Sequence, residues 1–217
     1  MPEEDISQIN PLDLRRERGI DADKILVDEL VEAISSKWEV PAESPKQPVI
    51  LLMGGFQGAG KTSITDHLSP RLPLLVISPD EIRHAMFQRI SFSATFVHSV
   101  NAARNRLIEK ALATGQHIVL DENATPTRMS VYKSLLKNST YKVLLAFFNT
   151  PKDILIKRLR SRPDIQGKYK GTVDELEASM KMQGEPDLGN FDLVFQTDKQ
   201  SPEEISEKLL QRVNNLQ

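Results

Sequence analysis

The segment from residue 55 to residue 63 has the residue types and spacing of a loop that binds phosphate. It reads Gly-Phe-Gln-Gly-Ala-Gly-Lys-Thr-Ser and follows the apolar run at residues 49–53. The glycines let the backbone wrap around an anion, and a helix beginning after them would point its positive end at the same anion. Lys61 would reach the β- and γ-phosphates of ATP, and the hydroxyl of Thr62 would bind Mg²⁺. The alternative is a glycine-rich turn between a buried strand and a helix. The expected site for ATP comprises Gly55, Phe56, Gln57, Gly58, Ala59, Gly60, Lys61, Thr62 and Ser63.

Asp80 and Arg83 follow the apolar run at residues 74–78 and are three residues apart, so a helix would place them on one face. A carboxylate there could accept the proton of an attacking hydroxyl, while the arginine holds the acceptor or a phosphate oxygen. Alternatively, Asp80 complements the dipole of its own helix and Arg83 is a solvated side chain. The spacing leaves both interpretations open.

Asp121 ends a third apolar run, at residues 117–121. In folds that hydrolyse nucleotides, a carboxylate at this point binds Mg²⁺, and Asp121 is predicted to do so through water. The alternative is an acidic strand end that leads into a turn around Pro126. Arg128, just past that turn, would face the same edge of the sheet and could contact the substrate.

Arg158 and Arg162 are four residues apart and would share a helix face. Both could close over the triphosphate and neutralise the charge of an in-line phosphoryl transfer. They predict a lid around residues 155–172. An exposed basic helix end that complements its own dipole would have a similar sequence.

These candidates belong to a chain in which strand and helix patterns alternate. Apolar runs predict five strands, at residues 49–53, 74–78, 117–121, 142–149 and 192–196. Such alternation is typical of an α/β fold with a parallel sheet covered by helices on both faces. In such sheets ligands bind beyond the carboxyl ends of the strands, where most of the candidate residues fall. We therefore expect a parallel sheet of the P-loop NTPase type with about five strands.

Residues 1–47 are expected to form an N-terminal helical extension, and residues 48–217 the phosphate-binding domain. The proline-rich stretch at 41–48 cannot be helix interior and predicts a linker. Upstream of it, apolar residues recur at helical spacing and predict one amphipathic helix. Its apolar stripe could dock on the core of the protein or bind a protein partner or inhibitor. The stripe consists of Ile25, Leu26, Leu30, Val31, Ile34 and Trp38.

Composition narrows the class of protein. The 217 residues are 39% hydrophobic and 27% charged, which is typical of a soluble protein with one core. No apolar run is long enough to span a bilayer, and the acidic start does not resemble a signal peptide, so we expect a cytoplasmic location. The absence of cysteine excludes disulfides and thiolate chemistry. With a net charge of −2, binding to a polynucleotide would need a local basic surface.

Residues 48 to about 198 resemble the P-loop kinases that include the polynucleotide 5′-hydroxyl kinases and the zeta-toxin kinases. The segment from Gly54 to Ser63 is similar to the zeta-type loop, in which two glycines open the motif and Thr-Ser closes it. Asp80 and Arg83 resemble the Asp-x-x-Arg element of the family. This resemblance implies that Asp80 is the general base and that Arg83 contacts the acceptor.

Arg158 and Arg162 are similar to the paired lid arginines of polynucleotide kinases. The chain departs from those kinases after the third strand, where Asp-Glu-Asn-Ala at 121–124 replaces Asp-x-Thr-Asn. The resemblance implies an ATP- and Mg²⁺-dependent kinase that transfers the γ-phosphoryl group to a hydroxyl. The acceptor could be a polynucleotide 5′-hydroxyl or a small molecule, such as the nucleotide sugar of zeta toxins. A nucleotide-operated switch without an acceptor is the alternative from another functional class.

Overall fold

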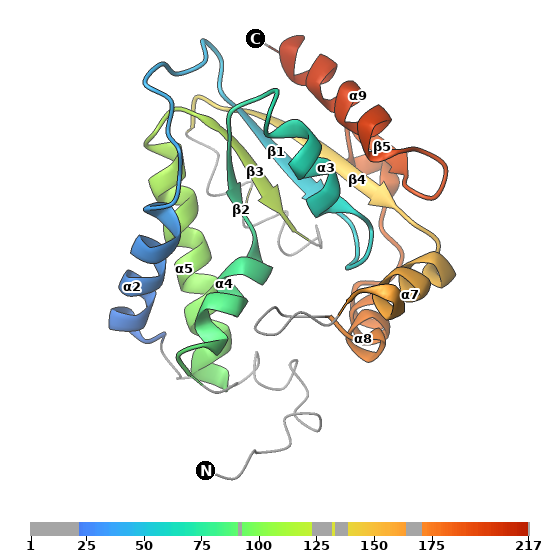
Figure 1. Cartoon of the computed structure of the whole chain (residues 1–217), viewed down its shortest axis with the longest axis horizontal. Coiled ribbons are helices and arrows are strands. Elements are labelled where there is room, and N and C mark those ends of the chain that lie inside the picture. The colour runs from blue at the N-terminus through green and yellow to red at the C-terminus, as the bar shows by residue number, and fades with distance from the viewer. Residues whose placement is uncertain (1–21, 91–92, 123–131, 133–138, 164–170, 217) are drawn as a thin grey trace. The chain divides into compact units, whose positions relative to one another are not determined.

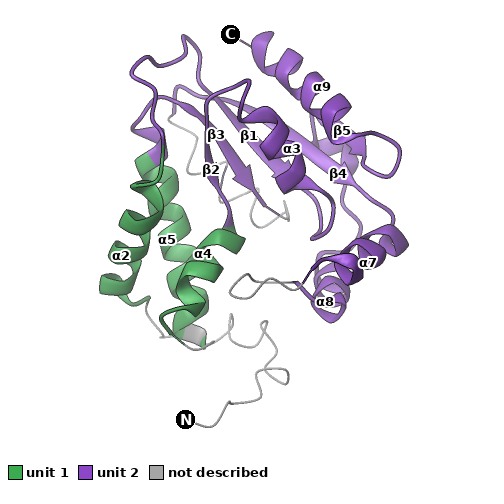
Figure 2. Cartoon of the chain, in the orientation of Figure 1, with its two compact units in different colours: residues 1–38, 79–110 green, residues 39–78, 111–217 purple. Residues whose placement is uncertain are grey.

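The computed structural model describes residues 22–90, 93–122, 132, 139–163 and 171–216 (Figure 1). The chain forms two compact units, which Figure 2 distinguishes by colour. The smaller unit combines residues 1–38 with 79–110, and the larger combines residues 39–78 with 111–217. The units are described separately below.

A parallel sheet of five strands organises the larger unit, in the order β2-β3-β1-β4-β5 (Figure 1). Each strand lies within one residue of its predicted bounds, so the predicted α/β fold with a five-stranded parallel sheet is confirmed. The central strand β1 is buried along its whole length because it has neighbours on both sides. The strands are β1 Val49–Gly54, β2 Leu74–Ile77, β3 His117–Asp121, β4 Lys142–Asn149 and β5 Leu193–Gln196.

Two helices of the larger unit pack against each other on one face of the sheet, α3 (Lys61–Leu68) and α9 (Pro202–Asn214) (Figure 1). Their apolar side chains join those of β1 and β4 in one core cluster. Helix α9 begins with a capping box formed by Ser201 and Glu204, and Pro202 occupies the first helical position between them. Between β4 and β5 lie α7 (Lys152–Ser161), α8 (Val173–Gln183) and the short helix η2 (Leu188–Asn190).

The smaller unit contains α2 (Lys24–Ser35), α4 (Pro79–Phe87) and most of α5 (Ala94–Leu112). The predicted apolar stripe is largely buried inside this unit, at Leu26, Leu30, Val31 and Ile34. Exposed residues of α2 form ion pairs with α5 and with the residues after α4: Asp28 with Arg106, Glu29 with Arg89, and Glu32 with Lys110. Four of the six stripe residues are thus covered within the protein. A partner at this helix stays a prediction, as does a domain boundary near residue 47. None of the helices in the described ranges has both the length and the apolar character needed to cross a bilayer.

Candidate active site

The phosphate loop connects the end of β1 to the start of α3, and its glycines adopt backbone conformations that other residues rarely reach. Gly55, Gly58 and Gly60 have φ values of 146°, 86° and 91°. A Cβ at Gly55 would also lie 2.9 Å from the carbonyl oxygen of Phe148 on β4. The glycines are therefore required both for the course of the loop and for its close approach to the neighbouring strand.

The loop ends at a helix N-terminus that no side chain caps. Gly60 is the N-cap of α3 and makes no side-chain capping hydrogen bond. The first N–H groups of a helix lack partners within the helix and carry the positive end of its dipole. Thr62 and Ser63 are exposed in this first turn. The donor set of backbone N–H groups, a lysine and hydroxyls fits the phosphates of a nucleotide.

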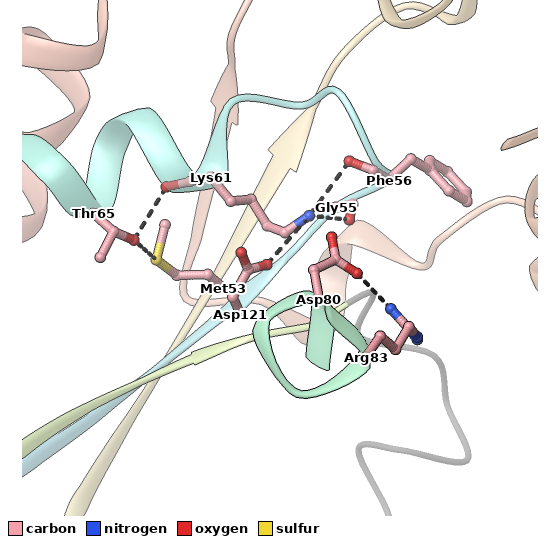
Figure 3. Close-up of polar contacts among 8 residues, drawn as sticks. All are labelled: Met53, Gly55, Phe56, Lys61, Thr65, Asp80, Arg83 and Asp121. Carbon is pink, nitrogen blue, oxygen red and sulfur yellow. Dashed lines mark hydrogen bonds and ion pairs between the residues drawn. The ribbon is translucent and has the colours of Figure 1, made fainter. Parts of the chain in front are cut away.

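Lys61 is 9% exposed, and its ammonium group is held at the loop. Its Nζ donates to the carbonyl oxygens of Gly55 at 2.8 Å and Phe56 at 3.4 Å. Asp121 Oδ1, on β3, lies 3.4 Å from the same Nζ (Figure 3). Met53 and Asp121 are register partners in the sheet, so the pairing of β1 with β3 brings this carboxylate to the loop. The predicted lysine and the predicted metal-binding aspartate thus lie together.

Glu122 is a neighbour of this group to which the sequence analysis gave no role. It is buried, and its N–H donates to Met53 O at 3.0 Å, which extends the pairing of β3 with β1 by one residue. One of its carboxylate oxygens accepts a hydrogen bond from the hydroxyl of Tyr132. A second acid directly after Asp121 was the only signal in the sequence, and nothing in it indicated the tyrosine.

Arg158 and Arg162 lie in different environments. The guanidinium of Arg158 is half-buried and donates to Gly58 O at 3.2 Å, Thr197 Oγ1 at 2.9 Å and Thr197 O at 2.6 Å. Arg162, at the C-cap of α7, is exposed. Thr197 follows β5, and its hydroxyl lies 2.6 Å from that of Thr150. Residues 164–170 of the predicted lid lie outside the described residues.

The tip of the loop contacts α8, the helix that follows the predicted lid. Gln57 Nε2 donates to Thr172 O at 2.9 Å, at the N-cap of α8. Beside Phe56 there is a cavity of about 370 Å³ between the end of β4 and the C-terminal end of α8. The lining combines aromatic, polar and charged residues. They are Phe56, Phe147, Phe148, Asn149, Thr150, Met180, Lys181, Gly184, Glu185 and Pro186.

Asp80 and Arg83 lie in the smaller unit, in the first turns of α4. They share a face as predicted, and Arg83 Nη1 donates to Asp80 Oδ1 at 2.5 Å (Figure 3). The side chain of Asp80 is 58% exposed and that of Arg83 is 26% exposed. In this structure the pair is therefore an exposed ion pair on one helix. Arg128, the other residue predicted to contact substrate, lies outside the described residues.

Two histidines on the elements that support the loop have shifted pKa values. At the C-terminal turn of α3, the ring nitrogens of His67 lie 2.7 Å from Ser63 O and 2.8 Å from Glu203 Oε1. Both partners are acceptors, and the backbone carbonyl and the carboxylate together raise the pKa of His67 above 6.5. His117 begins β3, and its Nδ1 accepts a hydrogen bond from Val49 N–H at 3.1 Å. Burial lowers the pKa of His117 below 6.5.

Several solved structures share the fold of this chain. A candidate kinase from Chloroflexus aurantiacus shares 20% identity at a TM-score of 0.63, over 80% of this chain and 100% of that one. A sugar kinase from Janibacter shares 17% identity at a TM-score of 0.55, over 77% and 95% of the two chains. The PezAT toxin–antitoxin system of Streptococcus pneumoniae contains a chain with 19% identity and a TM-score of 0.57, over 90% and 98%.

At these identities the similarity shows a common fold, that of the P-loop kinases. The resemblance to P-loop kinases is confirmed at that level, and the narrower choice between polynucleotide kinases and zeta toxins stays a prediction. No curated protein matches the chain significantly. The family model described as an AAA domain matches residues 50–186, which is more than half of the chain. The chain belongs to the AAA domain family.

Proposed function

We propose that this protein is an ATP- and Mg²⁺-dependent kinase that transfers the γ-phosphoryl group of ATP to a hydroxyl of a small molecule. The observation that carries the proposal is the position of Lys61. Its buried ammonium group lies in a glycine loop at an uncapped helix N-terminus and faces the carboxylate of Asp121. The AAA domain match supports nucleotide binding, and the sugar kinase with the same fold supports phosphoryl transfer to a hydroxyl.

In this proposal Lys61 leaves the carbonyls of Gly55 and Phe56 when ATP binds and donates to its β- and γ-phosphates. Thr62 and Asp121 hold Mg²⁺, which needs few protein ligands because it keeps water and takes phosphate oxygens. When bound, Mg²⁺ supplies positive charge next to the transferring group. Lys61 would thus supply the positive charge, Thr62 the hydroxyl, and Asp121 at the end of β3 the carboxylate of this site.

Asp80 is proposed as the general base and Arg83 as the residue that orients the acceptor. The two are bonded to each other on α4, and the exposed carboxylate of Asp80 could accept a proton from the acceptor hydroxyl. Arg162 is proposed to close over the transferring phosphoryl group, since its side chain is exposed at the end of α7. Arg128 stays a candidate for contact with the acceptor.

The sugar kinase with the same fold favours a small acceptor over a polynucleotide. The cavity beside Phe56 is about 370 Å³, within the size range of small-molecule sites, although it is lined by residues of the larger unit rather than by Asp80 and Arg83. Its lining includes one positive and one negative side chain, Lys181 and Glu185, rather than a basic stripe along which a polynucleotide backbone could lie. A nucleotide sugar is one such acceptor, and a 5′-hydroxyl oligonucleotide is the rival that an experiment must include.

Transfer of γ-labelled phosphate from ATP and Mg²⁺ tests the proposal, using nucleotide sugars, a metabolite extract and 5′-hydroxyl oligonucleotides as acceptors. We expect label on one small-molecule acceptor. Asp80→Asn should lower kcat by about 10² to 10⁴ with little change in ATP affinity, because only the proton acceptor is removed. Label on oligonucleotides alone would overturn the small-acceptor proposal. ATP binding with no labelled product, unchanged in Asp80→Asn, would favour a nucleotide-operated switch.

A further inference from the structure

We infer that Arg158 is a positioning residue that sets the shape of the phosphate loop, and that its task is separate from that of Arg162. This inference rests on the proposed function only in taking the loop as a nucleotide site. It differs from the expectation that both arginines close over the triphosphate.

Arg158 donates hydrogen bonds to three acceptors on two segments of the chain. Its Nη1 donates to Gly58 O and to Thr197 Oγ1, and its Nη2 donates to Thr197 O, at distances from 2.6 to 3.2 Å. The planar guanidinium presents donors in a rigid fork, so these bonds together fix its orientation. The arginine thereby joins the phosphate loop, 100 residues earlier in the chain, to the segment just after β5.

Thr197, which provides two of these acceptors, is itself held in place. Thr197 and Thr150 are 8% and 7% exposed, and their hydroxyl oxygens are 2.6 Å apart. The backbone N–H of Thr197 donates to Asn149 O at 3.2 Å, which continues the pairing of β5 with β4. A buried polar network whose members are satisfied is rigid. Arg158 is therefore anchored to the sheet while it holds the loop.

Arg158 holds the peptide that joins Gly58 to Ala59 in the phosphate loop. The carbonyl of Gly58 and the N–H of Ala59 belong to one planar trans peptide, so fixing one end fixes the direction of the other. Arg158 binds the oxygen, and the Ala59 N–H donates to Phe56 O at 3.1 Å. The peptide is thus held from both sides. A Cβ on Gly60 would lie 3.9 Å from Arg158 Nη1, so the guanidinium also lies against the N-cap of α3.

Nucleotide affinities can distinguish a positioning role for Arg158 from direct contact with the γ-phosphate. A residue that shapes the whole loop should affect every nucleotide that uses the loop, whereas one that binds only the γ-phosphate should affect ATP and not ADP. A residue with a purely structural role should lower thermal stability without selective loss of affinity.

The experiment measures dissociation constants of Mg-ATP and Mg-ADP by calorimetry. Arg158→Lys and Thr197→Val should each weaken both nucleotides by about tenfold, since each loses a charge-assisted hydrogen bond. The double variant should lose little more than either single variant, because the two residues act through one contact. Thr197→Ser, which retains the hydroxyl, should stay close to wild type. Arg160→Lys, at an exposed position on the same helix, is the matched control and should bind as wild type does.

Several results would overturn the inference. They are loss of ATP affinity with ADP affinity intact, unchanged affinities in both single variants, or single effects that multiply to about a hundredfold in the double variant. If thermal unfolding shows that Arg158→Lys does not fold, the comparison of Thr197→Val with Thr197→Ser still decides. A wild-type protein that binds neither nucleotide would instead refute the proposed function, and the inference with it.

Discussion

The phosphate loop and the start of α4 both carry charged residues predicted to act in phosphoryl transfer, but these residues have different kinds of partner. Lys61 and Arg158 donate to backbone carbonyls of the loop, which the fold fixes. Asp80 and Arg83 bind mainly each other, and the side chain of Asp80 is 58% exposed. Geometry imposed by backbone partners exists before any ligand binds. An exposed pair on one helix can exchange its partner for a ligand at little energetic cost.

The largest combined effect on kcat and ATP affinity should come from removing the cation in the loop. Lys61→Met should lower kcat by about 10² to 10³ and also weaken ATP binding, because the lysine contacts phosphates in both the ground state and the transition state. Asp80→Asn should lower kcat alone. Lys208→Met, at an exposed position on α9, is the control for loss of a lysine. If Lys61→Met binds ATP as wild type does, the loop does not hold the phosphates through this residue.

Gly55→Ala should break the loop through the backbone rather than through charge. The substitution forces alanine to a φ of 146° and places its Cβ 2.9 Å from Phe148 O. We expect a loss of unfolding free energy above about 2 kcal/mol. Gly184→Ala is the control for backbone strain alone, because its φ of 66° and ψ of −166° also favour glycine but a Cβ there would meet nothing within 4 Å, so it should lose less stability than Gly55→Ala. Equal losses in urea unfolding would mean that contact with β4 contributes nothing.

Removing the ion pair between Asp80 and Arg83 on α4 should change the binding of the acceptor more than the stability of the protein. Arg83→Gln removes a partly exposed ion pair, so the free energy of unfolding should change by less than about 1 kcal/mol. The KM for the acceptor should rise by about tenfold or more if Arg83 orients it. A large loss of stability without a change in KM would make the pair structural, and would remove the contrast with the loop.

The sequence predicted the elements that bring Lys61 to Asp121, and the structure confirms the strands within one residue. This success has a physical basis, because apolar runs identify buried parallel strands and their carboxyl ends share one edge. The acceptors of Arg158 could not be predicted. Spacing indicated that Arg158 and Arg162 share a helix face, but not that Arg158 would form hydrogen bonds with Thr197. That contact depends on how β5 pairs with β4 and where the chain leaves the sheet.

Glu122 illustrates the same limit. An acid that follows a strand is expected in solvent, yet it is 4% exposed, and Tyr132 donates to its carboxylate. The phenol replaces the water that the carboxylate loses on burial. One partner of the buried acid therefore lies ten positions later in the chain. Local pattern carries no information about such a partner, so the burial of Glu122 could not be predicted, unlike the position of Asp121 one residue earlier.

The smallest expected effect concerns pH and separates the two histidines that support the loop. The pKa of His67 is raised in the folded protein, so its contribution is present below pH 6.5 and is lost as pH rises through the folded pKa. The pKa of His117 is lowered, so the unfolded chain binds the extra proton, and stability is lost as pH falls from 6.5 toward the folded value.

Urea unfolding between pH 5 and 8 tests the direction of the pH dependence for both histidines. The deficit of His67→Gln relative to wild type should be largest at the acidic end of that range and shrink toward pH 8. His117→Asn should lose less stability than wild type between pH 7 and 5, because asparagine does not titrate. A deficit of His67→Gln that grew with pH would mean that the contact of α3 with Glu203 does not depend on a protonated ring.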